Sequence, residues 1–244
     1  MVSSKKVALI TGANKGIGYE IARQLGAQGI TVYIGSRNEL RGITSVNRLV
    51  TEGIDAKPVI IDLNDSGSID DAVHLIKTEH GHLDILVNNA GIIDPDDNSP
   101  GLASINTIKR TFETNFFGTF MVTQAMLPLL RKAESARIVN ISSGLGSLTL
   151  NQDPEWEFAE TKLIGYNSSK AALNMLTVQL AWELRNTGIK VNSANPNFTD
   201  TDLVPGAIGG RPVSDGARTA VGLALLSEDG PSGGFFDDGL ILPW

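Results

Sequence analysis

Short apolar segments alternate with longer stretches of helical period along this chain. Each short segment is rich in β-branched residues and is bounded by Gly, Asn, Asp or Pro, which is typical of a buried strand. Six strands are predicted on this basis, and a weaker seventh follows near the end of the chain: Val7–Ile10, Ile30–Ile34, Lys57–Ile61, Ile85–Val87, Arg137–Ile141, Ile189–Val191 and Leu240–Leu242. The alternation indicates a parallel sheet that helices cover on both faces.

The stretches between the strands carry the features of amphipathic helices. After the first strand, Ile17, Ile21 and Leu25 recur at four-residue spacing, and glycines close the segment. Helices are also predicted at Ser66–His80, Phe112–Leu130 and Ser168–Asn186. Three irregular stretches exceed ordinary connection lengths, which is typical of loops that build a site: Asp94–Ser104, Gly144–Gly165 and Asp200–Arg211. No repeat, low-complexity tract or linker marks a second domain.

Composition narrows the class of protein. The 244 residues suffice for a sizeable core, and the absence of cysteine excludes disulfides, thiolate zinc sites and a cysteine nucleophile. The net charge of −7 repels nucleic acid and acidic membranes. No apolar stretch is long enough to span a membrane, and the first residues lack the apolar segment of a signal peptide. We expect a cytoplasmic protein that binds neither nucleic acid nor membrane.

The turn after the first strand is rich in glycine. The segment Thr11-Gly12-Ala13-Asn14-Lys15-Gly16-Ile17-Gly18 leads directly into the first predicted helix. Gly12 suits a tight turn, Gly16 lets a ligand approach the backbone, and Gly18 lets the helix pack on the strand. The spacing is GxxxGxG rather than GxGxxG, and no Gly-Lys-Ser/Thr follows as in a P-loop. This position predicts binding of a dinucleotide pyrophosphate to the helix N-terminus.

The end of the second strand predicts which cofactor is bound. A ribose with a free 2′-hydroxyl usually meets Asp or Glu at this place, but here Ser36 and Arg37 follow the strand. A guanidinium binds a 2′-phosphate through charge-assisted hydrogen bonds, and Lys15 in the glycine turn adds a second cation. The sequence therefore predicts NADPH/NADP+ over NADH. The alternative is that both cations are solvated surface charges.

Three further motifs accompany the glycine turn. Asn88-Asn89-Ala90-Gly91 follows the fourth strand, Ser142-Ser143 follows the fifth, and Tyr166-Asn167-Ser168-Ser169-Lys170 lies in a predicted helix region. With these motifs the chain resembles the short-chain dehydrogenase/reductase family over essentially its whole length, and within it the NADPH-dependent carbonyl reductases. The resemblance implies a single-domain α/β Rossmann fold over residues 1–244, with a seven-stranded parallel sheet doubly wound by helices. It also implies hydride transfer to or from a carbonyl carbon.

The proposed catalytic set fits that chemistry. Reduction of a ketone needs a hydride on carbon and a proton on the developing alkoxide. Tyr166 would donate this proton, and Lys170, four residues later on the same helix face, would stabilise the phenolate. Ser143 would hydrogen-bond the substrate oxygen, whereas Ser142 is interpreted as a partner of the local backbone. By the resemblance Asn115 holds a water that links Lys170 to solvent; a capping or interhelical role is the alternative.

The resemblance also implies cofactor contacts beyond the glycine turn. Asp62 would bind the adenine amino group, and Leu63 would contact the same ring. The remaining implied contacts are Tyr166, Lys170, Asn89, Ala90, Gly91, Pro196 and Thr199. The Asn-Ala-Gly segment has an alternative role, which is to tie adjacent strands. Asn197 stands where the family commonly has glycine, and we expect the turn to form because Asn tolerates positive φ.

Other polar and aromatic residues are given structural roles. His74, His80 and His82 are interpreted as surface residues, so no metal site is predicted. The acidic segment Asp94–Asp97 lacks the features of a calcium loop and is interpreted as a solvated turn. Trp156 and Phe158 either form a substrate wall or pack in the core.

The expected function is reduction of a ketone or aldehyde to an alcohol. Oxidation of an alcohol by the same residues is the enzymatic alternative, and an NADP(H)-sensing protein without chemistry is the alternative from another class. The expected partner is a small-molecule carbonyl or alcohol. The substrate, its stereochemistry and the choice between monomer and homo-oligomer stay open, because long loops form the pocket.

Overall fold

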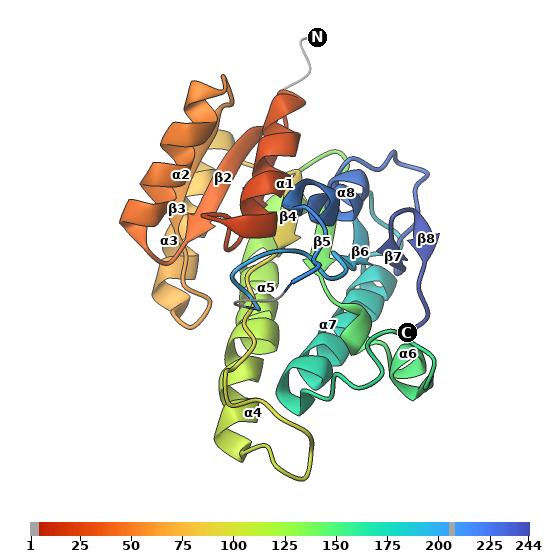
Figure 1. Ribbon diagram of the computed structural model, residues 1–244. Coiled ribbons are helices and arrows are strands. Elements are labelled where there is room, and N and C mark those ends of the chain that lie inside the picture. Colours follow the sequence, from red (N-terminus) through yellow and green to blue (C-terminus); the bar gives the residue numbers. More distant parts are fainter. Residues whose placement is uncertain (1–4, 205–207) are drawn as a thin grey trace.

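One sheet of eight strands forms the centre of the structure, a computed structural model that describes residues 5–204 and 208–244 (Figure 1). Residues 1–4 and 205–207, the latter within the predicted loop at 200–211, lie outside the described residues. The strand order is β3-β2-β1-β4-β5-β6-β7-β8, and all neighbours pair in parallel except β7 and β8. The strands are β1 (Val7–Ile10), β2 (Thr31–Ser36), β3 (Ala56–Ile60), β4 (Ile85–Asn88), β5 (Arg137–Ile141), β6 (Lys190–Ala194), β7 (Phe235–Asp237) and β8 (Leu240–Ile241).

The end of the sheet differs from the sequence prediction. The first six predicted strands are confirmed, but the seventh parallel strand is β7 rather than Leu240–Leu242. That later segment forms β8, a short antiparallel strand after a turn in which Asp238 and Gly239 have φ values of 44° and 83°. β7 has three residues between glycine- and aspartate-rich turns, so it is too short to show an alternating pattern. The doubly wound α/β fold is confirmed, with one strand more than predicted.

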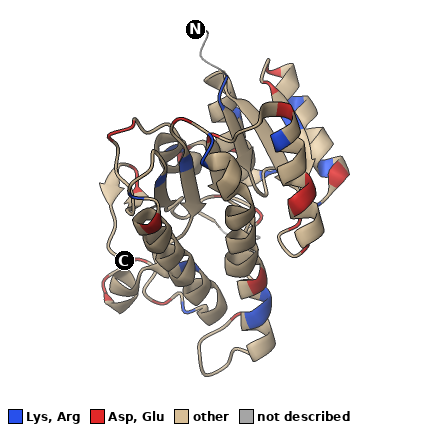
Figure 2. Cartoon of the chain, turned by 180° about the vertical axis from the view of Figure 1, so that it is seen from behind, with Lys and Arg blue, Asp and Glu red and all other residues tan. Residues whose placement is uncertain are grey.

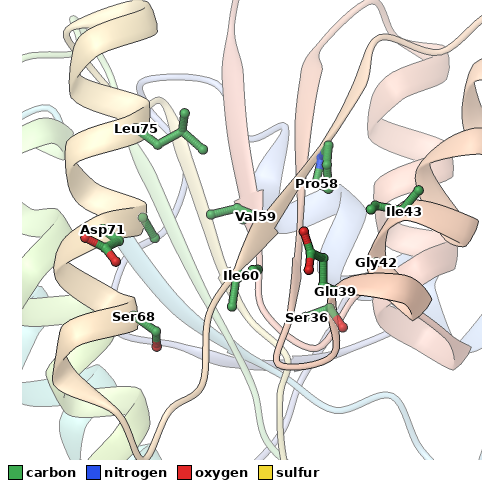
Figure 3. A pocket seen from close by; sticks show the side chains of 11 residues that line it. Ser36, Glu39, Gly42, Ile43, Pro58, Val59, Ile60, Ser68, Asp71 and Leu75 are labelled. Carbon is green, nitrogen blue, oxygen red and sulfur yellow. The ribbon is translucent and has the colours of Figure 1, made fainter.

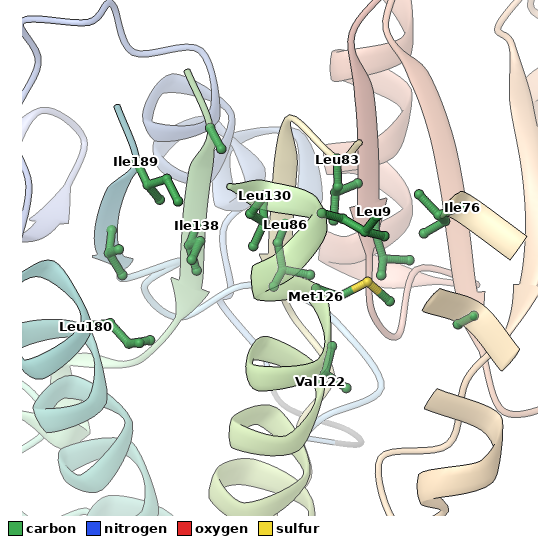
Figure 4. Close-up of a cluster of buried hydrophobic side chains, with 14 of the residues drawn as sticks. Leu9, Ile76, Leu83, Leu86, Val122, Met126, Leu130, Ile138, Leu180 and Ile189 are labelled. Carbon is green, nitrogen blue, oxygen red and sulfur yellow. The ribbon is translucent and has the colours of Figure 1, made fainter. Parts of the chain in front are cut away.

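Helices cover both faces of the sheet. The helices α1 (Gly16–Ala27), α2 (Glu39–Thr51) and α8 (Val213–Ala224) bury their apolar stripes on one face. On the other face lie α3 (Ser66–His80), α5 (Thr119–Leu130) and α7 (Ile164–Glu183). Figure 4 shows this second layer, where strand residues Leu86 and Ile138 face Met126 of α5 and Leu180 of α7. Removal of these side chains from water supplies the main stabilising term of the fold.

The predicted helix Phe112–Leu130 is interrupted. It consists of the end of α4 (Ile105–Phe112), a π-helical segment η1 (Glu113–Gly118) and α5. α5 carries no charged residue, and Figure 2 shows it tan along its length, with acidic and basic residues at its α4 end. π-helical turns are rare and frequently mark functional positions. This one contains Asn115, one of the predicted catalytic residues.

The loop between β5 and α7 is partly helical. It contains a short 3-10 turn, η2 (Gly144–Gly146), and a single-turn helix, α6 (Leu148–Gln152). α7 begins at Ile164, four residues before its predicted start at Ser168, so Tyr166 lies in its first turn. Since the strands are parallel, their carboxyl ends meet at one edge of the sheet. The order reverses between β1 and β4, where ligands of such sheets bind.

Candidate active site

A cavity of about 640 Å³ lies along the edge of the sheet where the carboxyl ends of the parallel strands meet. Its volume is in the range of small-molecule sites. All but one of the predicted cofactor residues line it: Gly12, Asn14, Lys15, Gly16, Ile17, Gly18, Ser36, Arg37, Asp62, Leu63, Asn89, Ala90, Gly91, Tyr166, Lys170 and Pro196. The remaining one, Thr199, is absent from this lining, and its hydroxyl donates to Pro196 O at 2.8 Å. The motifs that are separate in the sequence thus meet in one cleft.

The glycine turn allows backbone and ligand to approach closely. Gly12 and Gly16 have φ values of 63° and 56°, in the left-handed region that favours glycine. A Cβ on Gly12 would lie 2.9 Å from Ala90 Cα, and one on Gly18 would lie 2.4 Å from Asn89 Nδ2. In the described chain Lys15, the N-cap of α1, makes no side-chain capping hydrogen bond, and Gly16, Ile17 and Gly18 of the first turn line the cleft. This end fits a pyrophosphate.

Asn89 connects the ends of β1 and β4. Its side-chain amide donates to Thr11 O at 2.9 Å and to Gly12 O at 3.2 Å. In return the Thr11 hydroxyl accepts the N–H groups of Asn89 and Ala90 at 3.0 and 3.1 Å. The Asn-Ala-Gly segment therefore ties adjacent strands, and it also lines the cleft.

Three cations line the outer end of the cleft. Lys15 and Arg37 lie there as predicted, together with Arg41, which the sequence reasoning missed. Arg41 lies in the first turn of α2, only four positions after Arg37, and this closeness in sequence was the available signal. Both arginines are exposed, whereas Lys15 pairs with Asp202 at 2.8 Å. Their positive charge lies where a chain of net charge −7 would otherwise repel phosphates.

Tyr166 and Lys170 lie one turn apart on α7 at the inner end of the cleft. They are 6% and 4% exposed. Burial raises the pKa of Tyr166 to about 12, opposed by a hydrogen bond with Ser143, and burial lowers the pKa of Lys170 to about 8. The Lys170 ammonium donates to Ile141 O at 2.7 Å and lies 5.6 Å from the centroid of the Tyr166 ring. The phenol therefore stays protonated at neutral pH beside a lysine that can carry charge.

The two serines after β5 have different partners. The Ser142 hydroxyl donates to Asn174 Oδ1 at 2.6 Å, so its interpretation as a partner of the local backbone is wrong. The Ser143 side chain lowers the pKa of Tyr166 against the effect of burial, and its oxygen accepts the Leu145 N–H at 3.2 Å. Ser142 lines the cavity described above, and Ser143 does not. The serine expected to act with Tyr166 is nonetheless the one that influences its pKa.

Asn115 is completely buried in the π-helical segment. Its amide donates to Ile92 O at 2.9 Å and to the Ser169 hydroxyl at 3.0 Å, while its oxygen accepts the Ile92 N–H at 2.8 Å. The alternative interhelical role is therefore present. A Cβ on Gly91 would lie 3.4 Å from both Asn115 Oδ1 and Lys170 Nζ, so Gly91 keeps the space between these groups open. The water-holding role stays a prediction.

An aromatic cluster lies beside the segment that follows Ser143. Trp156 contacts Phe158 with ring centroids 5.5 Å apart, and Phe158 contacts Phe198 at 6.3 Å. A Cβ on Gly144, next to Ser143, would lie 3.0 Å from Trp156 Cζ2. The three rings are half-buried and outside the apolar core, and none of them lines the cleft.

Asn197 adopts the backbone conformation expected for a residue in place of glycine. Its φ is 52°, which confirms the prediction that this turn tolerates Asn. Its N–H donates to Asn195 Oδ1 at 3.1 Å, and the same oxygen accepts the Gly144 N–H at 3.1 Å. The turn is thereby joined to the segment that follows Ser143.

Two structural interpretations are wrong in part. The acidic segment forms a turn in which Pro95 and Asp96 are exposed, but Asp94 and Asp97 are only 5% and 9% exposed and are not solvated. His80 and His82 are half-buried, and the His80 ring is 2.9 Å from the Tyr33 hydroxyl, whereas His74 is exposed as predicted. Within residues 5–204 and 208–244, no group of three His, Cys, Asp or Glu side chains is arranged to hold a metal ion.

A second cavity of about 330 Å³ lies between α2, β3 and α3. Figure 3 shows Ser68, Asp71 and Leu75 of α3 on one side and Glu39 and Ile43 of α2 on the other, across β3. It shares only Ser36 with the predicted site residues. The larger cleft is therefore the candidate active site.

The fold and the glycine turn at the β1–β4 switch define a dinucleotide-binding α/β protein. The family model for short chain dehydrogenase matches residues 6–208, and the chain belongs to this family. (+)-Neomenthol dehydrogenase of Capsicum annuum is 33% identical over 304 residues, with 96% of each chain covered. NADPH carbonyl reductase 1 of Mus musculus is 34% identical over 283 residues, with 100% of both covered.

Solved structures of similar fold support the same family assignment. NADPH-bound carbonyl reductase from chicken fatty liver has a TM-score of 0.85 at 27% identity, with 98% of this chain and 99% of that chain covered. Salutaridine reductase from Papaver somniferum has a TM-score of 0.81 at 29% identity, with coverage of 96% and 100%. Among the described helices, none combines the length and apolar character needed to cross a membrane.

Proposed function

We propose that this chain reduces a ketone or aldehyde to an alcohol with NADPH, and that Tyr166 donates the proton. This proposal rests on one observation: the buried Tyr166–Lys170 pair lines the same cleft as the N-terminus of α1, which has no side-chain cap in the described chain. One end of this cleft suits pyrophosphate, and the other offers a protonated phenol beside a cation.

The cofactor supplies the hydride, and the chain supplies its binding groups. The N-terminus of α1 would hold the pyrophosphate, while Arg37, Arg41 and Lys15 would meet the 2′-phosphate that distinguishes NADPH from NADH. Asp62 and Leu63 line the cavity next to these cations and suit the adenine. The mouse and chicken relatives are both named as NADPH enzymes, which supports the same cofactor here.

The buried groups support proton transfer in both directions. With its pKa raised to about 12 by burial, the Tyr166 phenol holds its proton until an alkoxide develops. A charged Lys170 then stabilises the phenolate, and Ser143 shares the negative charge. The space that Gly91 leaves open between Asn115 Oδ1 and Lys170 Nζ supports a path by which water restores the proton. The reverse sequence would oxidise an alcohol, so these groups leave the direction to cofactor supply.

The aromatic cluster supports an apolar substrate. Trp156, Phe158 and Phe198 form adjoining rings beside the segment that carries Ser143. Such surfaces bind apolar groups and exclude water from the reacting carbonyl. We therefore expect faster turnover of bulky apolar ketones than of small hydrophilic ones.

The test combines a carbonyl panel with one substitution. Purified protein is offered aryl ketones, ketoesters and aldehydes with NADPH, and cofactor consumption is followed by absorbance. Tyr166→Phe should lower kcat by at least about a hundredfold, because general acid catalysis contributes 10²–10⁴-fold. It should leave NADPH affinity nearly intact, because the ring is retained and only the hydroxyl is lost.

Two outcomes would contradict the proposal. Retention of more than about a hundredth of kcat in Tyr166→Phe would remove Tyr166 as the acid. Tight NADPH binding without turnover of any compound in the panel would instead favour an NADP(H)-sensing protein.

A further inference from the structure

The N-terminus of α7 is capped by a residue from a distant loop. Leu163 occupies the N-cap and, in the described chain, forms no side-chain capping bond. Helix N-termini leave N–H groups without intrahelical partners. Here the Gly165 N–H donates to Asp97 Oδ1 at 3.0 Å, and the Tyr166 N–H donates to Asp97 Oδ2 at 2.7 Å. One carboxylate therefore accepts hydrogen bonds from the backbone of the proposed proton donor itself.

The position of the Asp97 carboxylate is closely determined. It is 9% exposed, and its Oδ1 also accepts the Asn98 N–H at 2.9 Å. Asn98 O accepts the Ile164 N–H at 3.0 Å, so two consecutive loop residues satisfy three N–H groups of the first turn. A Cβ on Gly165 would lie 3.0 Å from Asp97 Oδ2, so glycine permits this close approach.

An ion pair between the buried Asp94 and the exposed Arg110 holds the loop that carries Asp97. Arg110 of α4 donates from Nε to Asp94 Oδ2 at 2.7 Å and from Nη2 to Oδ1 at 3.0 Å. The Arg110 guanidinium lowers the pKa of the Asp94 carboxyl, which is 5% exposed. The Asp97 N–H in turn donates to Asp94 O at 2.9 Å. Contacts therefore run from α4 through the loop to the backbone of Tyr166.

We propose that Asp97 is a positioning residue for catalysis: it fixes the first turn of α7 and thereby the Tyr166 phenol. This inference rests on the proposed role of Tyr166. A carboxylate suits the positive end of the helix dipole, and its two oxygens accept hydrogen bonds from consecutive N–H groups. Lys170 lies one turn further into the helix, where intrahelical bonds hold it. Loss of Asp97 should therefore displace Tyr166 more than Lys170.

The experiment compares kcat with cofactor affinity. Asp97→Ala should lower kcat at saturating NADPH by about 10- to 100-fold, since small displacements of a catalytic group have effects of this size. The Kd for NADPH, measured by fluorescence titration, should change by less than about threefold. Asp97→Asn keeps one acceptor oxygen in an isosteric side chain, so it should recover part of the lost kcat.

Asp65→Ala is the matched control. The Asp65 side chain caps α3 by accepting the Gly67 N–H at 3.0 Å, and α3 carries none of the proposed catalytic residues. This variant removes a helix cap away from the proposed active site and should leave kcat within about twofold. Thermal unfolding of all variants shows whether the losses of stability are comparable.

Each outcome separates the two proposals. If Tyr166→Phe is inactive but Asp97→Ala and Asp97→Asn both keep wild-type kcat, Asp97 has no positioning role and the proposed function stands. A parallel loss of kcat and NADPH affinity, or an equal loss of kcat in Asp65→Ala, would likewise overturn the positioning role. If Tyr166→Phe retains turnover, the proposed function fails. Should Asp97→Ala not fold, the comparison of Asp97→Asn with wild type decides the question.

Discussion

The two ends of the cleft are built in opposite ways. At the inner end, Tyr166 and Lys170 are almost completely buried and are held by contacts within the protein. At the outer end, Arg37 and Arg41 are exposed, and Lys15 forms only an exposed ion pair with Asp202. The protein therefore positions its proposed catalytic groups in advance, while its proposed phosphate-binding groups stay in water.

Because of this difference, the inner end should affect the free energy of unfolding, and the outer end should affect the free energy of cofactor binding. Burial of an ionisable group costs stability, whereas an exposed charge costs little and a surface ion pair contributes little. Substitutions at the inner end should change kcat and stability together. Substitutions at the outer end should change cofactor affinity and leave stability nearly constant.

Lys170→Met, at the inner end, should have the largest effect on catalysis. We expect kcat to fall at least about a hundredfold, because no cation then stabilises the Tyr166 phenolate. The free energy of unfolding should rise by about 1–2 kcal/mol at pH 7, because each unit of depressed pKa corresponds to about 1.4 kcal/mol and the lost bond to Ile141 O offsets part of it. Steady-state kinetics and urea unfolding measure the two effects.

The pH dependence of that stability difference follows from the pKa of Lys170. Burial lowers this pKa to about 8 in the folded protein, from an ordinary value of 10.5. Below pH 8 the lysine is charged in both states, so the full cost of burying the charge is present. Between pH 8 and 10 the unfolded chain binds a proton that the folded chain lacks, so wild-type stability rises relative to the variant. The advantage of Lys170→Met should therefore shrink over this interval; a constant difference would contradict the buried charge.

Local spacing explains why much of the site was predictable from the sequence. The glycine turn is one continuous segment between β1 and α1, and Tyr166 and Lys170 lie one turn apart on α7, so residue spacing sets which groups meet. The capping contact of Asp97 joins residues 69 positions apart, and the Lys15–Asp202 pair spans 187 positions. The periodicity of hydrophobic residues is a local signal, so it does not predict contacts between such distant positions. The burial of Asp94 was missed for the same reason, since Arg110 lies on another element.

Arg37→Ala and Arg41→Ala, at the outer end, should have an effect of intermediate size on cofactor binding. Each should raise the KM for NADPH by about 10- to 100-fold, because hydrogen bonds to charged groups contribute about 1.5–3 kcal/mol. The KM for NADH should change little, because that cofactor lacks the 2′-phosphate. Ratios of kcat/KM for the two cofactors measure the effect, and the midpoint of thermal unfolding should stay constant.

Arg48→Ala is the matched control, on the same helix as Arg41. Arg48 packs over the Tyr19 ring at 4.7 Å and is absent from the lining of the cleft. It removes the same charge from α2, so any general effect of net charge on cofactor binding would appear in it as well. Equal or better use of NADH than NADPH by the wild-type protein would contradict the 2′-phosphate argument altogether.

Asn197→Gly should have the smallest effect, because it alters a turn between the two ends without removing a charge. Glycine adopts the φ of 52° observed at Asn197 more readily than asparagine does. The variant loses the hydrogen bond that the Phe198 N–H donates to Asn197 Oδ1 at 2.6 Å. Because these terms oppose each other, the Kd for NADPH should stay within about threefold.

That result would also show how the turn acts on the two ends. Asn195 Oδ1 accepts N–H groups from both Asn197 and Gly144, so the turn is joined to the catalytic segment by a side chain that the variant retains. If turnover and cofactor affinity both rose strongly in Asn197→Gly, the asparagine side chain would be obstructing the cleft. The inner end would then be only partly formed in the present sequence, and its contrast with the outer end would be weaker than the burial of Tyr166 and Lys170 indicates.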